Sequence, residues 1–292
     1  MFEGTGTALI TPFDENYDID YSALENLVNK QLDNNIDSLI ILGTTGEAPT
    51  IHRDEKKKLI KTVVNIVNGD IPVIIGTGTN DTSHVIQNSN DAKEWGADGQ
   101  LVVTPYYNKG TQDTLYKHYS YIAEETDLPI ILYNVPSRTG VNLEAETTVT
   151  LAEDNESIIA VKEASGDISQ VAKIIANKPA DFKVYSGNDD QAFPLIALGG
   201  HGLVSVASNV VPGKFVELTH NLLDNNMDAA REINNKYNVL MNSLFLETNP
   251  IPVKYAVSQQ GLCKNILRLP LSEMSEENSE KLKSVMQELE II

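Results

Sequence analysis

One unit recurs eight times in this chain of 292 residues: a short apolar run, then a polar or glycine-rich turn, then an amphipathic segment with helical spacing. A strand followed repeatedly by a helix is typical of a parallel sheet, because each unit alone is too small to bury its apolar face. Eight such units predict a closed (β/α)8 TIM barrel, a fold of about 250 residues. The apolar runs that we predict as strands are residues 7–10, 38–42, 72–75, 100–103, 129–133, 158–162, 183–186 and 203–206.

The main alternative is an open, doubly wound sheet. A dinucleotide-binding sheet of that kind carries a glycine fingerprint after its first strand, whereas residues 11–14 here read Thr-Pro-Phe-Asp. Beyond the eighth unit, apolar residues recur at helical spacing in residues 227–247 and 276–289, and residues 249–252 form a turn and helix start. We therefore expect a catalytic barrel over residues 1–224 and a C-terminal helical region over residues 225–292.

Charge and composition exclude several classes of function. The net charge of −19 argues against nucleic acids and anionic membranes as partners, since both require a basic surface. Cys263 is the only cysteine, and the five histidines have no short ligand spacing, so we expect neither an internal disulfide nor a metal site. Neither a signal-peptide pattern nor an apolar run of about 20 residues is present. These features predict a cytoplasmic protein.

Lys162 is an anomaly, because it ends an apolar run, Ile158 to Val161, that has the composition of a buried strand. An unpaired ammonium is costly to bury. One interpretation is an amine in an apolar pocket that favours its neutral form, which can attack a carbonyl and form a Schiff base. The other is a lysine that extends to water from the end of a strand. The run alone does not decide between them.

Catalytic side chains of such a barrel come from the carboxyl ends of its strands. Backbone N–H groups and hydroxyls of the turn at residues 43–46 can hold a carboxylate, although a helix-capping turn explains the same residues. Hydroxyls can relay protons near Lys162, and an arginine suits a carboxylate; core packing and an exposed loop cation are the respective alternatives. The residues concerned, at or after the ends of predicted strands, are Thr44, Thr45, Tyr106, Tyr107, Tyr133, Arg138 and Lys162.

Three segments together resemble the dihydrodipicolinate synthase family of pyruvate-dependent class I lyases. They are Gly43-Thr-Thr-Gly-Glu47, Tyr133-Asn-Val-Pro-Ser-Arg-Thr-Gly140 and Val161-Lys-Glu-Ala-Ser165. The similarity extends to residues 104–108, 199–202 and 249–254, and so covers essentially the whole chain. It implies a homo-oligomer, specifically a homotetramer built as a dimer of dimers, that requires no metal or organic cofactor.

The resemblance also implies a role for each site residue. Lys162 forms an imine with pyruvate. Tyr133, Thr44 and Tyr107 form a proton relay, with Tyr107 reaching in from a neighbouring subunit. Thr45 binds the pyruvate carboxylate, Arg138 binds the carboxylate of L-aspartate semialdehyde, and the carbonyl of Val204 lines the pocket.

The implied reaction joins pyruvate to L-aspartate semialdehyde and gives 4-hydroxy-tetrahydrodipicolinate, which leads to diaminopimelate and lysine. An N-acetylneuraminate lyase or a keto-deoxy-sugar-acid aldolase is the alternative enzyme. The pairing of Thr44 and Thr45 with residues 138–140 suits a short semialdehyde better than a polyol. A non-catalytic pyruvate-sensing or assembly protein that kept the barrel is a further alternative, but it would lack Lys162 or a relay hydroxyl, and none is missing.

Lysine-inhibited members of the family bind free lysine in a cleft at a dimer interface. The matching positions here are Ala48, Pro49, Arg53, Lys56, Asn80, His84 and Tyr106. Sensitive members carry histidine in place of Lys56 and glutamate in place of His84. A ligand ammonium would therefore lose an anion and meet a cation, so we expect insensitivity to lysine. A Lys56 that turns to solvent would instead leave weak inhibition.

Overall fold

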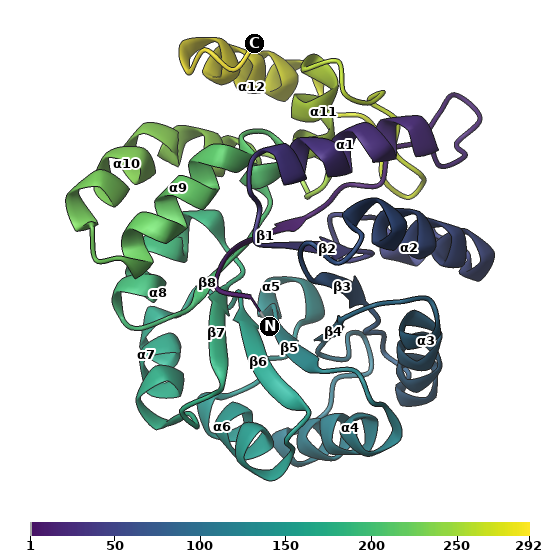
Figure 1. Ribbon diagram of the computed structural model, residues 1–292, viewed down its shortest axis with the longest axis vertical. Helices are drawn as coiled ribbons and strands as arrows, with labels where there is room; N and C mark the ends of the chain where they lie inside the picture. Colours follow the sequence, from purple (N-terminus) through teal and green to yellow (C-terminus); the bar gives the residue numbers. More distant parts are fainter. Residues whose placement is uncertain (1) are drawn as a thin grey trace.

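The computed structural model describes residues 2–292 and contains a closed barrel of eight parallel strands in sequential order (Figure 1). The prediction of a TIM barrel is confirmed. The strands are β1 (Gly4–Ala8), β2 (Ser38–Ile41), β3 (Val73–Gly76), β4 (Gly99–Val103), β5 (Ile130–Asn134), β6 (Ile158–Glu163), β7 (Lys183–Ser186) and β8 (Gly202–Ser205).

The first strand begins before the apolar run that predicted it. Its sequence, Gly-Thr-Gly-Thr-Ala, is not apolar, yet all five residues are buried. The threonines are satisfied by hydrogen bonds: Thr5 Oγ1 donates to the Phe215 carbonyl at 2.9 Å, and Thr7 Oγ1 donates to Gln31 Oε1 at 2.7 Å. Polar side chains that are fully paired can therefore occupy a buried strand, which an apolar pattern does not predict.

Helices alternate with the strands and surround the barrel (Figure 1). In α1, buried Leu24, Leu27 and Val28 lie at helical spacing, and Asp20 caps the first turn by accepting the N–H of Ala23 at 2.9 Å. Within residues 2–292, no helix is both long and apolar enough to cross a membrane. The helices up to the eighth strand are α1 (Tyr21–Asp33), α2 (Arg53–Val67), α3 (Thr82–Glu94), α4 (Gln112–Glu125), α5 (Pro136–Thr139), α6 (Ala145–Asp154), α7 (Ile168–Asn177) and α8 (Ala192–Ala197).

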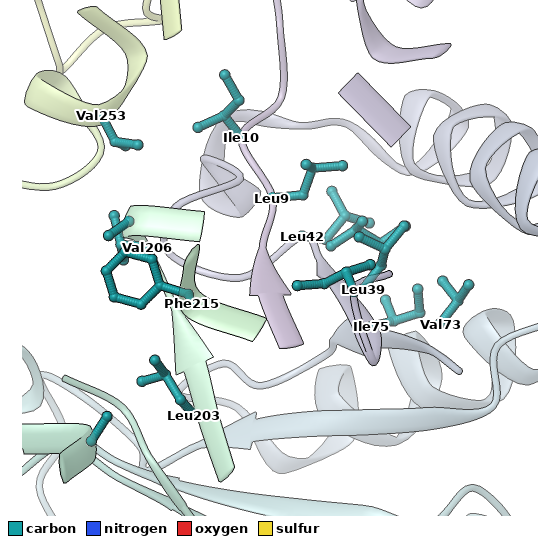
Figure 2. Close-up of a cluster of buried hydrophobic side chains, with 14 of the residues drawn as sticks. Leu9, Ile10, Leu39, Leu42, Val73, Ile75, Leu203, Val206, Phe215 and Val253 are labelled. Carbon is teal, nitrogen blue, oxygen red and sulfur yellow. The ribbon is translucent and has the colours of Figure 1, made fainter. Parts of the chain in front are cut away.

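Strand side chains alternate between two apolar layers. One set fills the barrel interior and includes Ala8, Ile40, Leu101 and Val204. The other set faces the helices, and Figure 2 shows part of it, where Leu39 and Leu42 lie close to Val73 and Ile75. Because Lys162 lies two residues from Ala160 on one side and Ala164 on the other, both in the interior layer, its side chain points into the barrel.

After α9 (Pro212–Leu223), three helices form the C-terminal part of the chain: α10 (Met227–Ser243), α11 (Ile251–Gln259) and α12 (Glu276–Glu288). The helices that we predict in residues 227–247 and 276–289 are present, although the first ends earlier. In Figure 1, α10 lies beside α9, while α11 and α12 lie beyond α1. Lys30 of α1 reaches this region, donating to Gln260 Oε1 at 2.9 Å. The division of the chain at residues 224/225 stays a prediction.

Candidate active site

A cavity of about 170 Å³ lies at the carboxyl end of the barrel strands, where such folds place their chemistry. Its lining brings together residues that are far apart in the sequence. The predicted site residues among them are Thr44, Thr45, Tyr133, Arg138 and Lys162. Sequence reasoning grouped these five by strand order alone, and the structure places them around one volume.

Lys162 supplies the amine of this cavity. The residue is 5% exposed, and its Nζ lies 4.3 Å from the centroid of the Tyr133 ring. Tyr133 and Lys162 are direct neighbours in the register of β5 and β6. Within residues 2–292, no carboxylate forms an ion pair with Lys162. The amine therefore faces a cavity rather than a structural partner, and the interpretation of a lysine that turns to water does not hold.

Gly187 leaves the space through which Lys162 extends. A Cβ atom at this position would lie 2.9 Å from Lys162 Cε and 2.7 Å from Ala164 Cβ. A real Cβ atom does not approach another carbon atom so closely, so any residue larger than glycine would displace the Lys162 side chain. The requirement for glycine after the seventh strand is thus steric.

The hydroxyl of Thr45 is held in place by the C-terminal part of the chain. Asn249 donates from Nδ2 to Thr45 Oγ1 at 3.0 Å, and both residues are buried. Thr44 lines the same cavity and is half-buried. Sequence reasoning assigned no site role to Asn249, although residues 249–254 belong to the family resemblance. Its Oδ1 has no hydrogen-bond partner within residues 2–292.

Arg138 lies at the cavity mouth on the short helix α5. Its guanidinium donates from Nη2 to the Asn249 carbonyl at 3.2 Å, and the side chain is otherwise exposed. This arrangement leaves further N–H donors of the guanidinium available to a carboxylate. A second, mainly apolar cavity of about 300 Å³ adjoins the first and shares Thr44, Tyr133 and Arg138 with it.

Three predicted site residues do not line the cavity in the single chain. Tyr106 lines the adjoining cavity of about 300 Å³ instead. Tyr107 is 91% exposed and has a φ of 71°, so its ring extends away from this subunit's cavity. Val204 is fully buried in the interior layer, and Val206 is the residue of that segment that lines the cavity. The predicted roles of Tyr107 and of the Val204 carbonyl stay predictions.

A buried ion pair anchors the Gly43–Glu47 turn. Lys254 of α11 bonds through Nζ to Glu47 Oε1, and the two side chains are 0% and 1% exposed. Burial lowers the pKa of Lys254, and the neighbouring Glu47 carboxylate acts in the opposite direction. The backbone N–H of Arg268 donates to Glu47 Oε2 at 3.1 Å. The C-terminal helices therefore fix the turn that carries Thr44 and Thr45.

Asp189 anchors the segments after the seventh and eighth strands. It accepts the Ser205 hydroxyl at 2.5 Å and the backbone N–H groups of Val206 and Ala207 at 3.1 and 3.2 Å. Desolvation raises the pKa of Asp189 to about 6, against the opposing effect of these hydrogen bonds. Its contacts hold Val206 against the cavity.

In the predicted lysine cleft, two of the polar residues already have partners. Arg53 forms a two-point ion pair with Asp91 at 2.6 Å, and His84 lies 2.7 Å from Asp81. Lys56 is half-buried, and desolvation lowers its pKa. The alternative of weak inhibition requires a Lys56 side chain that turns to solvent, whereas here the side chain is only partly exposed.

Among the described residues, 2–292, no three His, Cys, Asp or Glu side chains are grouped so that they could hold a metal ion. The Lys162 amine, the hydroxyls and amides around it and the Arg138 guanidinium are polar groups that line the cavity. An amine beside hydroxyl groups can form an imine and move protons around it. The arrangement therefore suits carbonyl chemistry on a small acid.

Comparison with known proteins gives a consistent result. The family model described as "Dihydrodipicolinate synthetase family" matches residues 1–289. A 4-hydroxy-tetrahydrodipicolinate synthase of Thermotoga neapolitana is 50% identical over 291 residues, covering 99% of each chain, and one of Alkaliphilus oremlandii is 50% identical over the full length of both. A crystal structure of dihydrodipicolinate synthase from Thermotoga maritima aligns over 100% of both chains, with 47% identity and a TM-score of 0.99.

Proposed function

The chain belongs to the dihydrodipicolinate synthetase family, and from that premise we propose which of its residues carry out the family's reaction. The reaction is the condensation of pyruvate with L-aspartate semialdehyde to 4-hydroxy-tetrahydrodipicolinate, catalysed by a lyase of the aldolase type on the way to diaminopimelate and lysine. The observation that supports our assignment most strongly is the Lys162 amine, which faces the cavity and has no carboxylate partner within residues 2–292.

Pyruvate binds first in this proposal. Its carboxylate accepts hydrogen bonds from the turn at Thr45, whose hydroxyl is oriented by Asn249 at 3.0 Å. The neutral amine of Lys162 attacks the C2 carbonyl carbon, and a carbinolamine forms. Tyr133, with its ring 4.3 Å from Nζ, and Thr44 pass protons to and from the oxygen until water leaves and an iminium remains.

The second half of the reaction uses the iminium as an electron sink. It acidifies the pyruvate methyl group, and the enamine formed by proton loss attacks the aldehyde carbon of L-aspartate semialdehyde. Arg138 holds the carboxylate of that substrate at the mouth of the cavity. The substrate's amine then attacks C2, closes the ring and releases Lys162. Because the protein supplies the sink covalently, the chemistry needs no metal or organic cofactor.

We propose a homo-oligomer, specifically a homotetramer arranged as a dimer of dimers, in which Tyr107 completes the relay of a neighbouring subunit. The 91% exposure of the Tyr107 side chain supports this, because a tyrosine so exposed has little contact with its own subunit. One solved relative, 47% identical with a TM-score of 0.98, is described as the first monomeric variant of a dihydrodipicolinate synthase. The cytoplasmic location stays a prediction.

The test of this function is an assay of the purified protein with pyruvate and a panel of aldehydes. L-aspartate semialdehyde should be turned over far faster than N-acetylmannosamine or glyceraldehyde, the aldehydes that a neuraminate lyase and a sugar-acid aldolase would use. Turnover of a polyol aldehyde at a comparable kcat/KM would assign the chain to one of those activities instead. Loss of all turnover in Lys162→Ala ties the activity to this site.

A further inference from the structure

The Glu163 carboxylate lies on the helix-facing side of β6, the strand that carries Lys162. Glu163 follows Lys162 on β6, so its side chain points away from the cavity, toward the helices. It is 2% exposed, and within residues 2–292 no lysine, arginine or histidine forms an ion pair with it. Such a group is stable only if hydrogen bonds replace its hydration.

Neutral N–H groups surround this carboxylate. The Ser165 backbone N–H donates at 2.6 Å, Gln170 Nε2 at 3.0 Å, and Asn134 Nδ2 lies 3.2 and 3.1 Å from the two oxygens. The orientation of the Asn134 amide is fixed independently, because its Oδ1 accepts the backbone N–H of Leu143 at 2.9 Å. Its Nδ2 must then face Glu163, so only an acceptor fits at this position.

Two of the donors belong to segments that carry the proposed reactive groups, and the third, Gln170, lies on α7. Asn134 follows Tyr133 on β5, and Ser165 follows the Lys162 strand. In the strand register, Tyr133 pairs with Lys162 and Asn134 with Glu163, so one pair lies directly beyond the other. Through Leu143, the network also reaches the segment after Arg138. One carboxylate thus connects the strand ends from which the relay hydroxyl and the nucleophile project.

We propose that Glu163 is a positioning residue, whose carboxylate fixes the spacing between Tyr133 and the Lys162 amine. This rests on the proposed roles of those two residues. The carboxylate contacts neither substrate nor the reacting atoms. It acts by keeping the carboxyl ends of β5 and β6 in their register relative to each other. Small misplacements of a nucleophile or proton donor reduce rates by about 100-fold per ångström, so the geometry behind the site matters to the reaction.

Glu163→Gln tests the proposal, because it keeps the shape of the side chain but turns one acceptor into a donor that meets other donors. The assay is rapid mixing with pyruvate, quenching with borohydride, and quantification of the Lys162 adduct over time by mass spectrometry. We expect imine formation to slow by about 10- to 100-fold.

Gln100→Met is the matched control. Gln100 is fully buried on β4, donates to Thr126 Oγ1 at 3.0 Å and to the Leu128 carbonyl at 3.2 Å, and does not line the cavity. This variant should melt at a lower temperature yet form the imine at the wild-type rate. Equal rates of imine formation for Glu163→Gln and Gln100→Met would overturn the proposal.

The experiment separates this proposal from the proposed function. A wild-type protein that forms no Lys162 adduct would refute the function itself, whereas a normal wild type with an unaffected Glu163→Gln refutes only the positioning role. If Glu163→Gln does not fold, Gln170→Leu replaces it, because that variant removes one donor and keeps the carboxylate. Slowed imine formation in Gln170→Leu would support the proposal, and an unchanged rate would overturn it.

Discussion

Replacing Lys254 with methionine should greatly destabilise the protein, because it leaves the Glu47 carboxylate buried without its cation. The paired side chains are 0% and 1% exposed, so water cannot compensate for the loss. The donor that remains is the Arg268 backbone N–H, at 3.1 Å from Glu47 Oε2. Breaking one side of a buried pair costs about 3 to 5 kcal/mol. For a chain of this size, that corresponds to a melting temperature lower by roughly 6 to 10 °C.

Thermal unfolding followed by circular dichroism at one fixed protein concentration measures this effect, since assembly makes the melting temperature depend on concentration. Lys214→Met is the matched control: its pair with Glu217 is 49% and 47% exposed, so it should melt close to the wild type. The double variant Glu47→Gln/Lys254→Met buries no charge and should be more stable than Lys254→Met. The reasoning is refuted if Lys254→Met melts within about 2 °C of the wild type, or if the double variant gains nothing.

Three further predictions concern catalysis and regulation. Arg138→Ala should still form the pyruvate imine but lose roughly 30- to 1000-fold in kcat/KM for L-aspartate semialdehyde. Arg138→Lys is the control variant. Loss of the imine would place Arg138 in the pyruvate site. Mixed oligomers of Tyr107→Phe and Lys162→Ala subunits should regain activity, and no rescue after confirmed exchange would confine Tyr107 to its own subunit. A titration of the initial rate with lysine should show that this enzyme binds lysine more than tenfold more weakly than sensitive enzymes do. His84→Glu with Lys56→His should begin to restore inhibition. Strong, saturable inhibition of the wild type would contradict the charge argument.

The barrel was predictable because its signal is repeated. Eight alternations of strand and helix leave few folds that can bury every unit, and an error at one boundary does not alter that conclusion. The start of β1 was missed because residues 4–8 are rich in glycine and threonine. Their burial depends on hydrogen bonds to partners such as Gln31 of α1 and Phe215 of α9, which are distant in the sequence.

Lys162 and Lys254 show what a sequence pattern cannot resolve. Each interrupts an apolar segment, the first in a strand and the second in α11. Lys254 is paired with Glu47, which is 207 positions away in the sequence, whereas Lys162 has a cavity in place of a carboxylate. Both lysines directly follow apolar residues, so only tertiary structure, or resemblance to a family, distinguishes a structural lysine from a nucleophile.

Asn249 was missed as a site residue for a related reason. In the sequence it precedes two closely spaced prolines, which indicate a turn, and the resemblance that includes residues 249–254 implied no role for it. Its side chain donates to Thr45 and its carbonyl accepts from Arg138 only because the segment between α10 and α11 returns to the turns that carry those residues. A contact between segments more than 100 residues apart leaves no local signal.

We infer that Lys162 is the nucleophile, and borohydride reduction in the presence of pyruvate is the direct test. Reduction traps an imine as a stable adduct, and mass spectrometry of the digested protein locates it. We expect one adduct per chain, on Lys162, that requires pyruvate and is absent from Lys162→Ala. An adduct on another lysine such as Lys254, or no adduct at all, would show that Lys162 is not the nucleophile.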